Sequence, residues 1–175
     1  MNAAPAPRLR AMDACDLPQV LAIQLACYGA DFVEAGPLIL RRLACAPATA
    51  WVAEHEGQVH AYLTGYPSRR GKLTALHGDF EPAAADADTL YLHDLAVHPS
   101  AHGLRLGPSL VAHALAHGRR QGWRYAALVA VQDSRGFWAR HGFVRAALAD
   151  AAQQARLASY PGTAVYMVRD ARATA

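Results

Sequence analysis

The spacing of apolar side chains predicts two helices in the first 50 residues. Residues 16–28 (DLPQVLAIQLACY) place most of their apolar side chains near helical spacing, and Pro18 is tolerated because the first helical turn has no intrahelical acceptor for its donors. Residues 37–46 continue in the same way until Pro47 ends the pattern. Before both helices, residues 8–12 favour a short strand.

Two β-rich runs follow, residues 49–54 and residues 58–66. The intervening His-Glu-Gly is a turn sequence, so the two runs predict a hairpin of adjacent antiparallel strands. Residues 67–88 are rich in Gly, Pro, Ala and Asp and show no regular period. We therefore expect a mobile loop there, close to the functional site.

The second half of the chain alternates strand-like and helix-like patterns. A strand over 89–97 leads through a glycine-bearing loop to a helix from Pro108 to about Arg120. The remaining patterns predict a strand over 124–131, a short helix over 134–141, a strand beginning at 142, a helix over 150–158 and a last strand over 163–169. We find no internal repeat, so residues 1–175 are expected to form a single domain, with residues 1–7 as a loose leader.

Composition changes this picture only in the core. The chain has 175 residues and 53% of them are hydrophobic, but 40 of those hydrophobic residues are alanines. A chain of this length buries enough surface to fold without disulfides or metals. The core is therefore expected to be sufficient but lean in bulky side chains.

The charge distribution argues against a dedicated nucleic-acid binder. Of the 17 basic residues 16 are arginines, and against 14 acidic residues they leave a net charge of only +3. The arginines are spread in pairs along the chain, whereas binding to a phosphate backbone needs many clustered cations. We expect no nucleic-acid partner.

The three cysteines point to a reducing compartment. Cys15, Cys27 and Cys45 are odd in number and contain no C-x-x-C pair, so neither a disulfide framework nor a zinc ribbon fits. The beginning of the chain has no apolar run of signal-peptide length, and the longest apolar stretch anywhere is residues 125–131. We therefore expect a soluble, cytoplasmic protein that does not bind a membrane.

The loop HPSAHGLRLG at 98–107 is the strongest candidate for a binding site. Pro108 suits the first turn of a helix, so the helix is expected to begin directly after Gly107. Backbone N–H groups from Gly103 to Gly107 can then converge on an anion, and the helix dipole adds roughly half a positive charge. The loop is therefore predicted to bind a phosphate group. Its sequence matches neither of two established phosphate motifs, G-x-G-x-x-G and G-x-x-x-x-G-K-[ST]. An ordinary strand-to-helix connection remains the alternative.

Residues 91–143 carry a family resemblance. LHDLAVHPSAHGLRLGPSL resembles the strand, cofactor loop and helix of the GNAT superfamily of coenzyme A-dependent N-acetyltransferases, and QDSRGFWARHGF resembles its later helix. The first strand and helix and the final TAVYMVR are also similar to that family. The resemblance implies an α/β fold with a mixed, mostly antiparallel sheet of six or seven strands flanked by about four helices.

The same resemblance implies an acetyl-CoA site. In that family the strand before the loop contacts the pantetheine arm through its main chain. The corresponding residues here are Leu95, Ala96 and Val97, beside the strand over 124–131. The pyrophosphate loop of the family corresponds here to His102, Gly103, Leu104, Arg105, Leu106, Gly107 and Pro108. Ser134, at the start of the predicted short helix, is expected as a further cofactor contact.

Three positions depart from the family pattern. His102 stands where the family usually has Arg or Gln, and Arg105 stands where it has glycine. A side chain at 105 disfavours the positive φ that glycine adopts there, although its guanidinium could contact phosphate directly. Trp138 occupies the place of a tyrosine that often protonates the leaving thiolate, so the acid must come from elsewhere or from solvent.

For catalysis we expect His93 as the general base and Tyr160 as the general acid. His93 and Asp94 point to opposite faces of their strand, and His93 has the ordinary pKa nearer neutrality, roughly 6.5. Tyr160 lies in a loop-like SYPG sequence, whereas the alternative, Tyr166, lies in a predicted strand. Hydrogen-bonded structural roles are the alternative for His93 and Asp94.

Other motifs are weaker. His113 and His117 are four residues apart on a helix, but no third ligand is evident, so we expect no metal. Cys27 lies in an apolar helix without a partner and is expected to be a buried thiol.

The sequence therefore predicts acetyl transfer from acetyl-CoA to a primary amine by direct attack, with a small molecule or a peptide as acceptor. Two alternatives stay open: an acyl-CoA-binding regulatory module without turnover, and a transferase for another acyl donor or an oxygen acceptor. A homodimer is also left open, and the residues that would choose the acceptor cannot be identified.

Overall fold

A computed structural model describes residues 6–83 and 85–172. Seven strands form one sheet in the order β1-β2-β3-β4-β5-β7-β6. Their bounds are β1 (Arg8–Ala11), β2 (Ala50–His55), β3 (Gln58–Ser68), β4 (Thr89–Val97), β5 (Tyr125–Ala130), β6 (Val144–Arg145) and β7 (Val165–Asp170). β4 and β5 run parallel and the β1–β2, β2–β3, β5–β7 and β6–β7 pairs are antiparallel, which confirms the expected mixed sheet.

The chain divides into two compact units, which we describe separately. One holds residues 1–64 and 94–113, and the other holds residues 65–93 and 114–175. Residues 1–5 of the expected leader lie outside the described residues. That the whole chain folds as a single domain stays a prediction.

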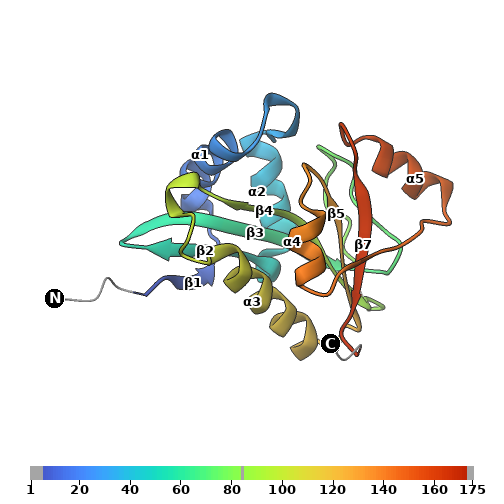
Figure 1. Ribbon diagram of the computed structural model, residues 1–175. Helices are drawn as coiled ribbons and strands as arrows, with labels where there is room; N and C mark the ends of the chain where they lie inside the picture. Colours follow the sequence, from blue (N-terminus) through green and yellow to red (C-terminus); the bar gives the residue numbers. More distant parts are fainter. Residues whose placement is uncertain (1–5, 84, 173–175) are drawn as a thin grey trace. The chain divides into compact units, whose positions relative to one another are not determined.

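The first unit contains the predicted hairpin and two helices, α1 (Leu17–Cys27) and α2 (Gly36–Cys45) (Figure 1). β2 pairs with β3 from Ala50 opposite Thr64 to His55 opposite Gln58. Apolar side chains of the helices and the hairpin share one buried cluster, whose members include Val20, Ile23, Ile39, Val52 and Tyr62. The ends of both helices lie within about one residue of the predicted ends.

A carboxylate network fixes the start of α1. Asp13 accepts from the Cys15 amide at 2.7 Å and caps the short 3-10 helix Ala14–Asp16. Asp16 in turn accepts from the Asp13 amide at 2.9 Å and from the Arg10 guanidinium at 2.8 Å. The hydrogen bonds from Arg10 lower the pKa of Asp16. Side-chain contacts of Arg10 and Asp16 thereby fix β1 against the start of α1.

The second unit is built around β5 and β7. β4 pairs in parallel with β5 from Thr89 opposite Tyr125 to Leu92 opposite Leu128, and β7 pairs with β5 along its full length. A Cβ at Gly65 would lie 2.3 Å from the carbonyl oxygen of Tyr91. Only glycine allows that close approach of two backbones.

Three further α-helices are α3 (Leu106–Arg120), α4 (Arg135–Arg140) and α5 (Ala151–Ala158), which makes five rather than about four in the described residues. The prediction that α3 begins after Gly107 was wrong by two residues. Pro108 lies within the first turn instead of opening it. The first-turn amides have no intrahelical acceptor, so proline is tolerated at any of those positions and does not fix the start.

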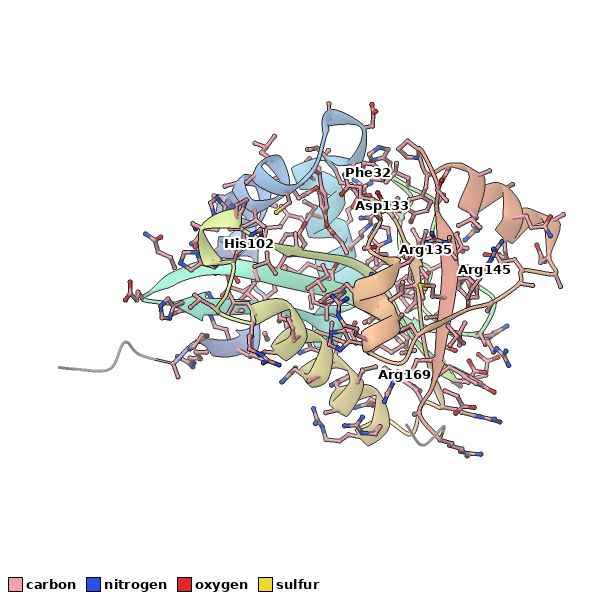
Figure 2. All side chains as sticks on the ribbon, in the orientation of Figure 1. Phe32, His102, Asp133, Arg135, Arg145 and Arg169 are labelled. Atoms are coloured by element: carbon pink, nitrogen blue, oxygen red, sulfur yellow. The ribbon has the colours of Figure 1, made fainter. Side chains whose placement is uncertain are left out.

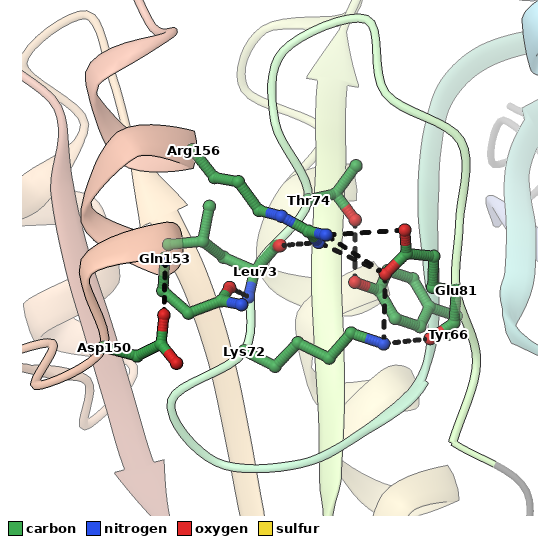
Figure 3. Close-up of polar contacts among 8 residues, drawn as sticks. All are labelled: Tyr66, Lys72, Leu73, Thr74, Glu81, Asp150, Gln153 and Arg156. Atoms are coloured by element: carbon green, nitrogen blue, oxygen red, sulfur yellow. Dashed lines mark hydrogen bonds and ion pairs between the residues drawn. The ribbon is translucent and has the colours of Figure 1, made fainter.

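Residues 69–88 have no regular secondary structure in their described part, but many hydrogen bonds hold them. The Leu73 amide donates to Gln153 Oε1 at 2.9 Å, and the Leu73 carbonyl accepts from Arg156 at 3.0 Å (Figure 3). Arg156 also contacts Glu81, whose carbonyl oxygen accepts from Lys72 Nζ at 2.6 Å. Leu73 is fully buried. The expected mobile loop is instead attached to α5.

No helix in the described ranges is both long enough and apolar enough to cross a membrane.

Candidate active site

The turn after β4 is compact and hydrogen-bonded at its beginning. The His98 ring accepts from the Ser100 amide at 3.2 Å, and the short 3-10 helix Pro99–Ala101 follows. The His102 amide donates to the Pro99 carbonyl at 3.2 Å. Figure 2 labels His102 on this turn, between β4 and α3. The turn thus has a defined shape before it reaches α3.

The later part of the same turn leaves its amides without acceptors. Among residues 6–83 and 85–172, none accepts a hydrogen bond from the amides of Gly103, Arg105, Leu106 or Gly107. Gly103 has φ +95° and Arg105 has φ +56°. A left-handed residue next to the first turn of a helix makes successive N–H groups converge, and such a concave set of amides binds anions.

Arg105 therefore adopts the conformation that glycine would adopt most easily. The left-handed region costs a residue with a Cβ about 1 kcal/mol. The Arg105 side chain is exposed and no described residue gives it a carboxylate partner, so its charge is available to an anionic ligand. Free amides, an unpaired guanidinium and the N-terminus of a 15-residue helix together fit a phosphate-type anion.

The end of β4 presents alternate main-chain groups to opposite edges. The His98 amide donates to the His60 carbonyl of β3 at 2.8 Å, so Ala96 faces β3 and Leu95 and Val97 face the other edge. The Val97 carbonyl accepts from the Cys27 thiol, and the Leu95 carbonyl lies within hydrogen-bonding distance of the hydroxyl of the next residue, Tyr28. Tyr28 Oη lies 3.0 Å from the Leu95 oxygen, and Cys27 Sγ lies 3.1 Å from the Val97 oxygen.

Asp94 lies between two phenols. Tyr28 donates to its Oδ1 and Tyr62 donates to its Oδ2, both at 2.5 Å. Tyr28 follows the last residue of α1, and Tyr62 lies in the buried face of β3. One carboxylate thus binds two hydroxyls, one of which also touches the main chain at Leu95.

Electrostatics keep both phenols protonated. Burial raises the pKa of Tyr28 well above its usual value, and the Asp94 charge adds to the effect. Burial and Asp94 act in the same way on the pKa of Tyr62. Burial also raises the pKa of Cys27. In this cluster Asp94 is therefore a carboxylate that accepts from two protonated phenols.

His93, the neighbour of Asp94, packs in the second unit. Its ring stands edge-on to Phe80 at 5.4 Å between centroids and lies 6.3 Å from the ring of Tyr91. Tyr160 is 8% exposed and donates its hydroxyl to the Thr74 carbonyl at 2.8 Å. Burial raises the pKa of Tyr91 well above its usual value, and the neighbouring phenol of Tyr160 adds to the effect. The structure therefore places His93 and Tyr160 around the same buried tyrosine, and their catalytic roles stay predictions.

Trp138 fills an apolar position on α4. It is 8% exposed and stands edge-on to Phe143 at 5.4 Å. Ser134 precedes α4 and makes no side-chain capping bond there. Figure 2 labels its neighbours Asp133 and Arg135 at the start of this helix. Tyr166, the alternative acid, accepts from the Gly71 amide at 2.8 Å.

The predicted residues fall into two groups. Leu95, Ala96, Val97 and residues 102–108 lie together in the first unit, whereas His93, Ser134 and Tyr160 belong to the second. Sequence reasoning did not connect Tyr28 and Tyr62 with Asp94. No local pattern marks them, because they lie 66 and 32 residues away from it in the chain.

Comparison with known proteins agrees with this arrangement. The sequence model of the acetyltransferase (GNAT) family matches residues 17–143. Among solved structures, the GNAT-like decarboxylase GphF in complex with isobutyryl-CoA is 21% identical with a TM-score of 0.73, over 94% of this chain and 100% of that one. The ribosomal-protein-S18-alanine N-acetyltransferase from Escherichia coli is 15% identical with a TM-score of 0.66, over 97% and 96%.

A third structure, the PaiA N-acetyltransferase from Thermoplasma acidophilum in complex with coenzyme A, is 11% identical with a TM-score of 0.65, over 95% of this chain and 99% of that one. No curated protein matches the chain. At these identities the structures establish the fold, whereas the sequence match spans most of the chain from α1 to Phe143. The chain belongs to the acetyltransferase (GNAT) family and is an acyltransferase.

Proposed function

We propose that the protein transfers the acetyl group of acetyl-CoA to a primary amine by direct attack, without a covalent enzyme intermediate. The observation that carries this proposal is the set of four acceptor-free amides, those of Gly103, Arg105, Leu106 and Gly107. Acetyl-CoA supplies an activated thioester, and the enzyme has to hold it, accept the proton of the amine and protonate the thiolate.

The donor site is proposed on the first unit. Residues 102–108 bind the pyrophosphate through their amides, with His102 and Arg105 as cationic or donating side chains. The main chain of Leu95, Ala96 and Val97 binds the pantetheine arm, and the groups of Leu95 and Val97 lie along the edge opposite β3. Ser134 is proposed as a further donor contact. Structures of related fold bound to coenzyme A and to isobutyryl-CoA support a CoA-linked donor.

Calorimetric titration with acetyl-CoA tests the donor site directly. We expect one site per chain with a dissociation constant in the micromolar range, and free phosphate should bind far more weakly because it reaches only the loop. No binding at millimolar acetyl-CoA would overturn the assignment. A thiol-release assay against small amines, amino acids, peptides and aminoglycosides then identifies the acceptor.

The catalytic roles of His93 as base and Tyr160 as acid are carried forward as a proposal. Tyr160 would have to release the Thr74 carbonyl before it could protonate a thiolate. The variants His93→Ala and Tyr160→Phe decide the point at saturating substrates. If each keeps kcat within about threefold of wild type, both roles are wrong, while the donor site is unaffected.

A second candidate is transfer of a longer acyl group. It is favoured by the similarity to GphF, whose structure holds isobutyryl-CoA. A panel of acetyl-, propionyl-, isobutyryl- and malonyl-CoA with thiol detection separates the two: acetyl-CoA should give the highest kcat/KM. Binding without any turnover would instead indicate a regulatory module.

We further infer a cytoplasmic location, and a homodimer is left to sedimentation analysis.

A further inference from the structure

The strongest unexplained feature is the Tyr28–Asp94–Tyr62 cluster at the edge of β4. The family resemblance places a phenol at position 138, but the chain has a buried tryptophan there. A thiolate leaving group needs a proton from some other group, or from water. The following inference rests on the proposed acetyl transfer and offers another base and acid in place of His93 and Tyr160.

Position selects Tyr28 among the tyrosines. The first unit contains two tyrosines in its described part, Tyr28 and Tyr62, and only Tyr28 touches the main chain of 95–97. In the proposed complex the pyrophosphate lies beyond Val97, so an arm that follows the edge passes Val97 first and Leu95 next. Its sulfur end therefore arrives beside the hydroxyl that already lies 3.0 Å from the Leu95 oxygen.

We propose that Tyr28 and Asp94 form a proton relay in which Asp94 takes the proton of the attacking amine and Tyr28 delivers its own proton to the departing sulfur. The nitrogen–carbon bond forms and the carbon–sulfur bond breaks. The single proton lost by nitrogen appears on sulfur, and both side chains return to their starting states.

The direction of one hydrogen bond controls the relay. While Asp94 is ionised it accepts from Tyr28 at 2.5 Å, and the hydroxyl proton is held there. A protonated carboxyl donates where a carboxylate accepts. Once Asp94 gains a proton, it donates to the Tyr28 oxygen, and the hydroxyl can turn to the sulfur. Tyr28 never becomes a phenolate.

This feature resolves an objection to Tyr28 as a simple acid. Burial raises the pKa of Tyr28, and the nearby titratable groups Asp94, Cys27 and Glu34 add to the effect. A phenol of raised pKa is a poor source of a net proton. In the relay it loses and regains a proton in one sequence, so the anion is avoided.

Tyr62 provides a matched control within the same cluster. It donates to the other oxygen of Asp94 over the same distance but makes no hydrogen bond to the main chain of Leu95 or Val97. Tyr62→Phe therefore removes the same kind of bond from Asp94 without removing the relay proton. Tyr160→Phe serves as the control for the competing acid.

The experiment compares two acetyl donors in each variant. With acetyl-CoA, Tyr28→Phe and Asp94→Asn should each lower kcat by about 100-fold, within the usual range for lost acid–base catalysis, and Tyr62→Phe by less than about fivefold. With S-(4-nitrophenyl) thioacetate, whose thiolate needs no proton, Tyr28→Phe should come within about threefold of wild type in kcat/KM, while Asp94→Asn stays low.

Binding and stability complete the readout. The dissociation constant for coenzyme A should change less than about threefold in all four variants, and their melting temperatures show that they fold. Equal losses in Tyr28→Phe and Tyr62→Phe, or a Tyr28→Phe enzyme that keeps kcat with acetyl-CoA, overturn the relay. If Tyr28→Phe does not fold, a retained rate in Asp94→Asn overturns it. Failure of the wild-type protein to bind coenzyme A overturns the proposed function itself.

Discussion

Two irregular segments flank β4, and they differ in where their backbone groups bond. In residues 69–88 the amides of Leu73, Leu76, Ala83 and Asp88 all have protein acceptors. In the turn that leads to α3, four amides have none among the described residues. A segment whose donors are satisfied by the protein is structural, whereas one whose donors converge unsatisfied is prepared for a ligand.

The same contrast appears in the arginines. Arg156 in α5 binds the Leu73 carbonyl and Glu81, so its charge is used within the fold. Arg105 has an exposed side chain and sits in a conformation that disfavours a side chain at all. Equal charges therefore have different expected roles, and substitutions at the two positions should affect different measurements.

The largest effect is expected from reversing the charge of the ligand loop. Arg105→Glu should raise the dissociation constant for coenzyme A about 100-fold, because a charge-assisted contact becomes a repulsion. Calorimetry measures it. Arg119→Glu, the same change near the other end of α3, is the control and should change binding less than threefold. Equal losses in both variants would show that only net charge matters.

Next comes the structural segment. Arg156→Ala leaves the Leu73 carbonyl without this donor and should lower the free energy of unfolding by about 1–2 kcal/mol. Chemical denaturation measures the loss, and hydrogen exchange should show faster exchange over residues 69–88. Coenzyme A affinity should stay unchanged. A variant that lost affinity but kept its stability would contradict the division between the two segments.

A smaller effect of opposite sign is expected at the strained residue. Arg105→Gly relieves the positive φ and should raise the free energy of unfolding by about 0.5 kcal/mol, after the greater freedom of glycine in the unfolded chain is subtracted. The same change should weaken coenzyme A binding, since the guanidinium is gone. If stability falls, the left-handed conformation at 105 is not a source of strain.

The smallest effect concerns pH. Partial burial raises the pKa of Glu81, but the charge and hydrogen bonds of Arg156, with help from Lys72, lower it below its usual value overall. A lowered folded-state pKa contributes stability above the unfolded-state pKa, and that stability is lost as pH falls through the folded-state value. Because Glu81 is well exposed, the contribution should be at most about 0.5 kcal/mol.

Glu81→Gln isolates this contribution. Wild type should lose slightly more stability than the variant between pH 5 and pH 3, as measured by denaturation at each pH. Parallel curves for the two proteins would mean that Glu81 does not couple residues 69–88 to pH.

Much of the fold was predictable because its signals are local. The period of apolar residues gave β4 its bounds of 89–97 and placed α1, α2 and α5 within one residue or so. The anion loop could also be found, since glycines, a proline and a strand-to-helix change all lie within ten residues. The positive φ at Arg105 was the one strained feature that the family pattern indicated in advance.

The misjudged parts depend on contacts distant in sequence. Residues 69–88 lack any pattern of their own, and what orders them comes from Gln153, Arg156 and Ser159. Asp94 was considered only as an alternative to His93, since its two phenols arrive from α1 and β3. Spacing along one segment cannot show which side chains a sheet brings together.

The attachment of Lys72 has a practical consequence for labelling. It is the chain's only lysine, and its amine is bonded to the Glu81 carbonyl oxygen and lies 3.5 Å from the Glu81 carboxylate. Amine-reactive reagents should therefore modify this side chain more slowly while these contacts hold than when residues 69–88 open. A single mass increment at Lys72, followed over time, would report the opening frequency of that segment in the unmodified protein, without any introduced probe.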